Sequence, residues 1–155
     1  MRKINSVLSV LVLSILIGCS TDKVSEKKMM STSTKKKKVV YQVFTRLFGN
    51  TNTTNKPWGT IEENGVGKFN DFTDKALTEI KDLGVTHIWY TGVPHHDVIR
   101  DYTKFGISND DPDVVKGRAG SPYAVKDYYN VNPDLAVNVE SRLQEFESLI
   151  ERSHK

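Results

Sequence analysis

The sequence predicts an α/β fold in which strands and helices alternate along the chain. Two runs of β-branched and aromatic residues, 39–44 and 85–90, are each typical of a largely buried strand. Between them, apolar residues recur at helical spacing from Phe72 to Leu83. A strand, a helix and a strand in this order predict a parallel pair joined by a right-handed crossover.

Both expected helices have recognisable ends. Asp71 is a good N-cap for the first helix, with Asp74 three residues further on in a variant of the capping box. Gly84 follows the last apolar residue and is expected at the C′ position, where a left-handed conformation ends many helices. A final helix is expected from about Val139 to Ser153, because its apolar residues form one stripe and its charged residues the opposite face.

Two long loops follow the carboxyl ends of the expected strands, over 49–70 and 91–138. Loops of this length inside a compact domain are usually functional. In a (β/α)8 barrel the same ends of the strands form the active site. The expected fold is therefore α/β, the first two βα units of a (β/α)8 TIM barrel. It would be incomplete in this chain, because such a barrel typically needs about 250 residues.

The N-terminal segment predicts export and a lipid anchor. Arg2 and Lys3 precede an apolar run, 7–17, that is too short to span the roughly 30 Å of a bilayer core. The run ends in Leu-Ile-Gly-Cys, which resembles a lipobox with Cys19 as the acylated residue. An ordinary signal peptide, or a buried apolar helix with a chance cysteine, is the alternative. Residues 1–18 would be the signal peptide, 19–38 a Ser/Thr/Lys-rich flexible tether, and 39–155 the folded part.

The charge distribution argues against a nucleic-acid partner. Nine of the 22 basic residues and two of the 19 acidic residues precede Val39. The 13 basic and 17 acidic residues that remain give the expected folded part a net charge of about −4. A nucleic-acid-binding domain would need a basic face, whereas a neutral polysaccharide is compatible with this charge.

The segment from Gly120 to Asp134 is the most informative part of the chain. It places three tyrosines within seven residues, between two prolines, and its pattern is too irregular for a core strand. Tyrosine rings offer flat apolar faces that can stack on the C–H faces of a sugar while their hydroxyl groups remain hydrogen-bonded.

Four segments together resemble the alpha-amylase family of glycoside hydrolases. Residues 40–48 resemble its first barrel strand, 83–93 the next helix end and strand, 121–133 its sugar-binding loop, and 142–154 the helix before its third strand. With the lipobox, the resemblance extends to the surface starch-degrading lipoproteins of Bacteroidetes-type bacteria. It implies a lipid-anchored hydrolase at the bacterial outer membrane or cell surface that cleaves α-glucosidic bonds in starch-like polysaccharides.

The resemblance assigns roles to three residues of the tyrosine segment. The tyrosine matching Tyr123 stacks on the sugar at the cleavage site, whereas Asp127 and Tyr128 match a pair that mainly holds the loop in shape. Tyr128 and Tyr129 are expected to pack. Gly120 stands where family members that trim single glucose units often have an aspartate, which favours an open cleft.

The resemblance also implies a retaining mechanism with an aspartate nucleophile, a glutamate acid/base and a second aspartate. All three are expected beyond Lys155, so the chain contains no catalytic residue and residues 39–155 alone should fold poorly and be inactive. A non-catalytic glucan-binding surface lipoprotein is the main alternative. The third alternative is a lipoprotein in which the barrel-like N-terminal part serves another interaction.

Metal binding is not predicted for this chain. His95 and His96 are adjacent and have no third ligand at a recognisable spacing, so they are interpreted as polar loop residues. The Asn-rich loop at 50–55 occupies a place where some family members bind Ca²⁺, but it has no aspartate to attract a hard cation. Ca²⁺ binding by a longer protein that contains this chain is left open.

Overall fold

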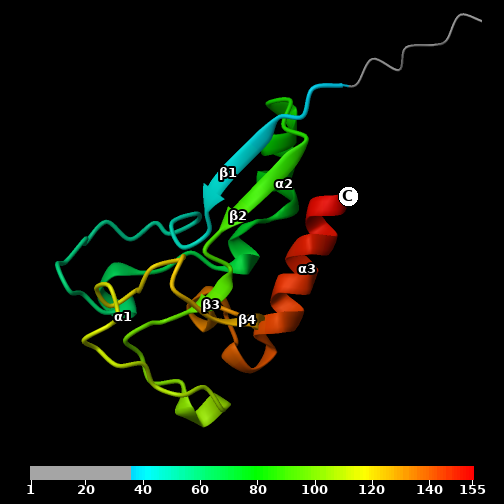
Figure 1. Ribbon diagram of the computed structural model, residues 1–155. Coiled ribbons are helices and arrows are strands. Elements are labelled where there is room, and N and C mark those ends of the chain that lie inside the picture. The colour runs from blue at the N-terminus through cyan, green and yellow to red at the C-terminus, as the bar shows by residue number, and fades with distance from the viewer. Residues whose placement is uncertain (1–35) are drawn as a thin grey trace, which may run out of the picture. The chain divides into compact units, whose positions relative to one another are not determined.

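The computed structural model describes residues 36–155, so the predictions for the signal peptide, for Cys19 and for most of the tether lie outside the described residues. Figure 1 shows a mixed arrangement of helices and strands, which confirms the general α/β character. In chain order the elements are β1 (Val40–Phe44), α1 (Ile61–Asn64), α2 (Asp74–Asp82), β2 (His87–Thr91), β3 (Pro94–His96), β4 (Val125–Val131) and α3 (Arg142–His154). None of the helices in this range is long and apolar enough to cross a membrane.

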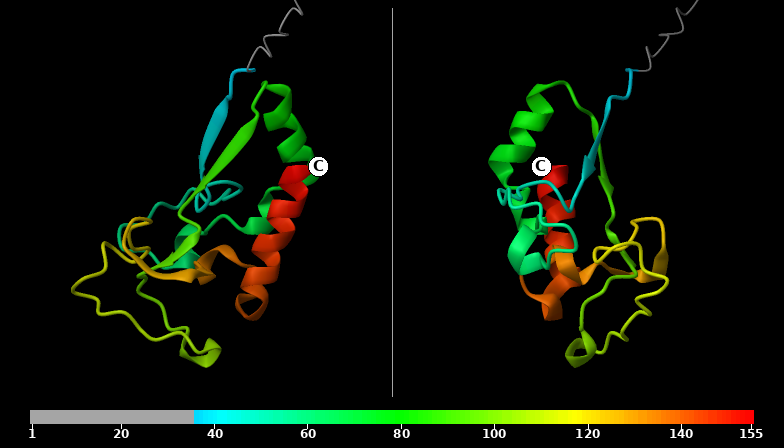
Figure 2. Two further views of the ribbon diagram at one scale, coloured as in Figure 1. Left: turned by 45° about the vertical axis from the view of Figure 1, so that its right-hand side comes forward. Right: turned by 90° about the vertical axis from the view of Figure 1, so that its left-hand side faces the viewer.

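The predicted parallel pair is confirmed. β1 and β2 pair in parallel with an unbroken register that runs from Val40 opposite His87 to Phe44 opposite Thr91. Helices α2 and α3 lie on the same side of this pair (Figure 2). The two strands form a sheet of their own within the described residues, and β3 and β4 form a second small sheet.

The main core fills the space between the β1–β2 pair and the helices. Val43 of β1, Leu77 of α2 and Leu149 of α3 are all buried in it. Phe72 joins them through two aromatic contacts, a stacked one to Phe48 with ring centroids 4.1 Å apart and an edge-on one to Tyr90 at 5.0 Å. Burial of these large apolar side chains is the main source of stability for this layer.

The start of α2 differs from the prediction by two residues. Thr73, and not Asp71, is the N-cap, and its side chain accepts a hydrogen bond from the backbone N–H of Ala76. The Asp71 carboxylate instead accepts from the backbone N–H of Lys68 and closes a short 3-10 turn before the helix. Gly84 has φ +82° directly after the C-cap, so the predicted helix end is confirmed.

The long second loop contains a β-hairpin that the sequence prediction missed. β3 and β4 pair antiparallel, with irregularities in register on both sides of His95. The interpretation of this whole region as a loop is therefore wrong, because Val125–Val131 is a strand even though most of its side chains are at least partly exposed. β4 lacks the alternation of apolar and polar residues from which a strand is usually recognised.

The first strand is less buried than predicted. In β1 only Val43 is buried, and Val40 and Phe44 are exposed on the side away from the helices. Trp89 of β2 is exposed as well, opposite Gln42 in the register. Within the described residues the β1–β2 pair is covered on one face only.

Candidate functional site

The tyrosine segment lies against the carboxyl ends of the two parallel strands. Gly92, the residue after β2, is in close contact with both neighbours. A Cβ atom at this position would lie 3.3 Å from the ring of Phe44, the last residue of β1. The same atom would lie 3.4 Å from Pro122 Cβ. Gly92 has φ +87°, a conformation that glycine adopts without strain. The close approach of these three residues places Tyr123 beside the strand ends.

Tyr123 projects into solvent from a well-defined turn. Its side chain is 78% exposed, and its backbone N–H donates to Ser121 Oγ at 3.3 Å. Gly120 begins the turn at φ +68°, where a Cβ atom would lie only 1.7 Å from the Asp97 carbonyl oxygen. This position therefore requires glycine for backbone reasons, and an aspartate here would need the Asp97 peptide to move.

The other two tyrosines are also exposed. Tyr128 is 80% and Tyr129 95% exposed, so the packing expected for these two rings is not seen in the described part of the chain. The loop-shaping role of Tyr128 stays a prediction. β4 belongs to a two-stranded ribbon, and no further described element covers these rings. Asp127 Oδ1 accepts a hydrogen bond of 2.9 Å from the Tyr129 backbone N–H, a local contact of the loop-shaping kind.

The histidine pair does not lie on a polar loop. His95 and His96 are part of β3 and are both buried, which corrects their interpretation as polar loop residues. His96 Nε2 lies 3.1 Å from the Ala119 carbonyl oxygen and 3.2 Å from Asn132 Nδ2, so it connects β3 to the segment that leads into Gly120. Burial lowers the pKa of His95, and the positive charge of Lys126 adds to this effect.

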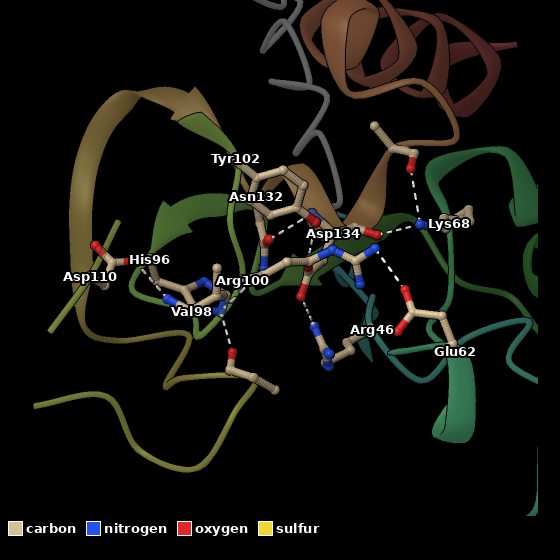
Figure 3. Close-up of polar contacts among 12 residues, drawn as sticks. Arg46, Glu62, Lys68, His96, Val98, Arg100, Tyr102, Asp110, Asn132 and Asp134 are labelled. Atoms are coloured by element: carbon tan, nitrogen blue, oxygen red, sulfur yellow. Dashed lines mark hydrogen bonds and ion pairs between the residues drawn. The ribbon is translucent and has the colours of Figure 1, made fainter. Parts of the chain in front are cut away.

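A buried polar network is centred on Asp134, the last residue of the tyrosine segment (Figure 3). Arg46 Nη1 lies 2.6 Å from Asp134 Oδ2, and the Tyr102 hydroxyl group donates to Asp134 Oδ1 at 2.5 Å. Lys68 Nζ donates to the carbonyl oxygens of Asp134 and Ala136 at 2.6 and 2.9 Å. The network fixes the turn after β4 to the first residues beyond β1.

The electrostatics of this network follow from its burial. Burial raises the pKa of Tyr102, and the neighbouring Asp134 carboxylate raises it further because the two negative charges would repel. Burial also lowers the pKa of Lys68, an effect that Asp134 opposes. Asp134 is thus a carboxylate held by a cation and a hydroxyl donor, an arrangement suited to positioning the backbone.

Sequence reasoning missed this network because its members are far apart along the chain. Arg46 and Asp134 are 88 residues apart, and Tyr102 and Asp134 are 32 residues apart. One local signal was present. Asn132-Pro133-Asp134 is a capped turn in which Asn132 Oδ1 accepts from the Asp134 N–H at 3.0 Å, and Arg46 lies two residues after an expected strand.

The asparagines considered for Ca²⁺ are engaged in backbone hydrogen bonds. Asn50 Oδ1 accepts from the Asn52 N–H, and Asn52 Oδ1 accepts from the Thr54 N–H. Over residues 36–155 no cluster of three or more His, Cys, Asp or Glu side chains is arranged to hold a metal ion.

Chemically, this site offers exposed aromatic faces on a fixed backbone at the ends of two parallel strands. The two acidic residues nearest to it in sequence, Asp127 and Asp134, accept hydrogen bonds that hold the local backbone or the buried network. Such a surface can bind and orient a ligand with apolar faces and hydroxyl groups. Compared with models of known protein families, with curated proteins and with solved structures, the chain matches none of them.

Proposed function

We propose that the complete product of the gene encoding this chain, called the full-length protein below, is an alpha-amylase-type glycoside hydrolase. It would cleave α-glucosidic bonds in starch-like polysaccharides by the retaining mechanism, with its catalytic carboxylates outside this chain. The observation behind the proposal is the position of Tyr123, an exposed ring on a fixed turn beside the carboxyl ends of β1 and β2. These ends are where α/β barrels bind their substrates.

The chemistry of the surface favours a neutral sugar. A glucose unit has one apolar C–H face that stacks on an aromatic ring, and hydroxyl groups that need polar partners at its edge. Tyr123 supplies the ring, which is 78% exposed. The net negative charge from Val39 onward disfavours a polyanionic substrate.

Replacing Tyr123 by alanine in the full-length protein should lower kcat/KM on maltooligosaccharides by about tenfold or more, which corresponds to roughly 1.4 kcal/mol of transition-state stabilisation. The melting temperature should barely change, because the ring is exposed. Tyr129→Ala is the matched control, since this tyrosine is even more exposed, at 95%, but has no assigned substrate contact. A large loss of stability with normal specific activity would show that Tyr123 is a packing residue.

A non-catalytic glucan-binding lipoprotein is the second candidate, and the exposure of three tyrosines favours it because binding requires nothing more than such a surface. The two candidates differ in turnover. Retention on insoluble starch without release of reducing sugar would support the binding protein, and release of reducing sugar supports the hydrolase. Failure of both assays would favour the third candidate, a lipoprotein that serves another interaction.

For localisation we propose a membrane-anchored lipoprotein with acylated Cys19 as its mature N-terminus. Cys19→Ser in the full-length protein should move it from the membrane fraction to the soluble fraction, because the acyl chains provide the anchor. The matched control is Ser20→Ala, which leaves the cysteine in place. Unchanged membrane retention of Cys19→Ser would contradict the anchor.

A further inference from the structure

The loop after β1 is held by its own asparagine side chains. The Asn64 side chain makes two hydrogen bonds to the backbone of Lys56. Its Oδ1 accepts from the Lys56 N–H at 2.7 Å, and its Nδ2 donates to the Lys56 carbonyl oxygen at 2.9 Å. Asn50 and Asn52 donate to the carbonyl oxygens of Asn64 and Glu63, both at 3.0 Å. These bonds join the two ends of the loop, so the segment between Lys56 and α1 has a defined shape.

Trp58 lies in the turn from Lys56 to Gly59, where the Gly59 N–H donates to the Lys56 carbonyl oxygen, and it has a strained conformation. It has φ +57°, a region that bulky side chains rarely adopt, and its side chain is 69% exposed. The strain is not offset by burial of the indole ring. Strained backbone of this kind persists where the surrounding structure enforces it, and it occurs often at ligand-binding sites.

Trp58 borders a pocket of about 720 Å³. The loop after β1 forms one wall, and the residues 99–101 and 117–119 form the other. Asp134 and Arg46 line it as well, so the buried network connects this pocket to the tyrosine segment. A volume of this size is typical of sites for small ligands.

The charges in the pocket are largely paired. Arg46 is bound to Asp134, and Arg100 Nη2 lies 2.9 Å from Glu62 Oε1. Lys56, which is paired with Glu63, and Arg118 line the pocket as well. An anionic ligand such as a phosphate would meet the carboxylates of Glu62, Asp101 and Asp134, and Arg118 is the one lining cation outside the described ion pairs. An uncharged polyol can instead accept from the guanidinium groups and donate to the carboxylates without disturbing either pair.

From these observations we propose that Trp58 is the aromatic platform of a second α-glucan subsite, separate from the surface at Tyr123. The indole face would stack on one glucose unit, and the Arg100–Glu62 pair would bind its hydroxyl groups. This proposal rests on the proposed function for its ligand class. It predicts that a long oligosaccharide gains affinity from Trp58.

The conformation of Trp58 provides the test. Because φ +57° suits glycine, Trp58→Gly in the full-length protein should leave the melting temperature unchanged or raise it. It should also weaken binding of maltoheptaose, supplied as a non-hydrolysable thio-linked analogue and measured by calorimetry, by about fivefold or more, as expected for loss of a stacking ring. Trp58→Phe, which keeps a flat ring, should retain most of the affinity. Leu83→Ala removes another exposed apolar side chain, outside the pocket, and should bind like the wild type.

The outcomes separate the two proposals. Equal maltoheptaose affinity in wild type and Trp58→Gly would overturn the second subsite and leave the proposed function standing. A clear fall in melting temperature in Trp58→Gly would also overturn it, because Trp58 would then be a packing residue. If the wild-type protein binds no maltoheptaose, the subsite and the glucan assignment both fail.

Discussion

Asp134→Asn is expected to destabilise the full-length protein by about 3–5 kcal/mol, the usual effect of removing one partner of a buried ion pair. The Asp134 side chain is only 2% exposed, and its loss leaves the Arg46 guanidinium group without its anion. The Tyr102 hydroxyl group, which is also buried, would lose its carboxylate acceptor. No other described contact replaces these two.

Thermal unfolding measures this effect, since each kcal/mol shifts the melting temperature of a domain of 150–250 residues by roughly 2–4 °C. Glu79→Gln is the control, because the exposed pair of Lys75 and Glu79 should contribute no more than about 1 kcal/mol. Arg46→Met combined with Asp134→Leu should recover part of the loss, since apolar pairs often replace buried ion pairs. A loss no larger than that of Glu79→Gln would contradict the role assigned to the network.

The parts of the fold that could be predicted from the sequence are those with local signals. Leu77 and Ile80 of α2 recur at helical spacing and are buried, as is Phe72 just before the helix, whereas Leu83 at its C-cap is exposed. The strand pairing followed from element order alone. The N-cap was missed because Asp71 and Thr73 are both good capping residues, and only the fold decides that Asp71 binds the Lys68 N–H.

The hairpin and the site could be predicted only in part, because they depend on contacts between distant segments. β3 begins with a proline and has three residues, and β4 exposes two adjacent tyrosines, so neither shows the period of a buried strand. The irregular pattern of the tyrosine segment excluded a core strand, and the stacking role of Tyr123 came from the family resemblance alone. The Asp134 network was not predicted, because it joins residues that follow β1, β3 and β4.

The exposure of one face of the β1–β2 pair also could not be predicted from local signals. Val40, Phe44 and Trp89 are apolar and were expected to be buried, yet they are exposed on the side of the pair away from the helices. Strands with apolar residues on both faces are typical of parallel sheets that are covered on both sides. This pattern is compatible with the proposed barrel.

The last prediction concerns His95 and the response of the β3–β4 hairpin to acid. The His95 side chain is 2% exposed, and neither ring nitrogen has a hydrogen-bond partner among the described residues. The charged groups that act on it are Lys126 and Arg142, which oppose its protonation, and Asp110 and Asp127, which favour it. Burial is the largest effect, so the pKa of His95 is below the ordinary value of 6.5.

The sign of the pH dependence follows from this direction. Well above pH 6.5 the imidazole is neutral in both the folded and the unfolded protein, and it adds no pH dependence. Below that value the unfolded chain takes up a proton that the folded hairpin resists, so stability falls as the pH falls. The slope from this one group is at most about 1.4 kcal/mol per pH unit, and it ends once the pH reaches the folded-state pKa.

Hydrogen exchange of the backbone amides of 125–131 in the full-length protein measures this locally. Wild-type protection, corrected for the intrinsic pH dependence of exchange, should fall between pH 7 and pH 5. In His95→Gln the fall should be smaller, because glutamine does not titrate. His87→Gln, a change at an exposed histidine outside the hairpin, should behave like the wild type. An equal fall in wild type and His95→Gln would show that another group causes the acid response, and the buried His95 would then have no part in it.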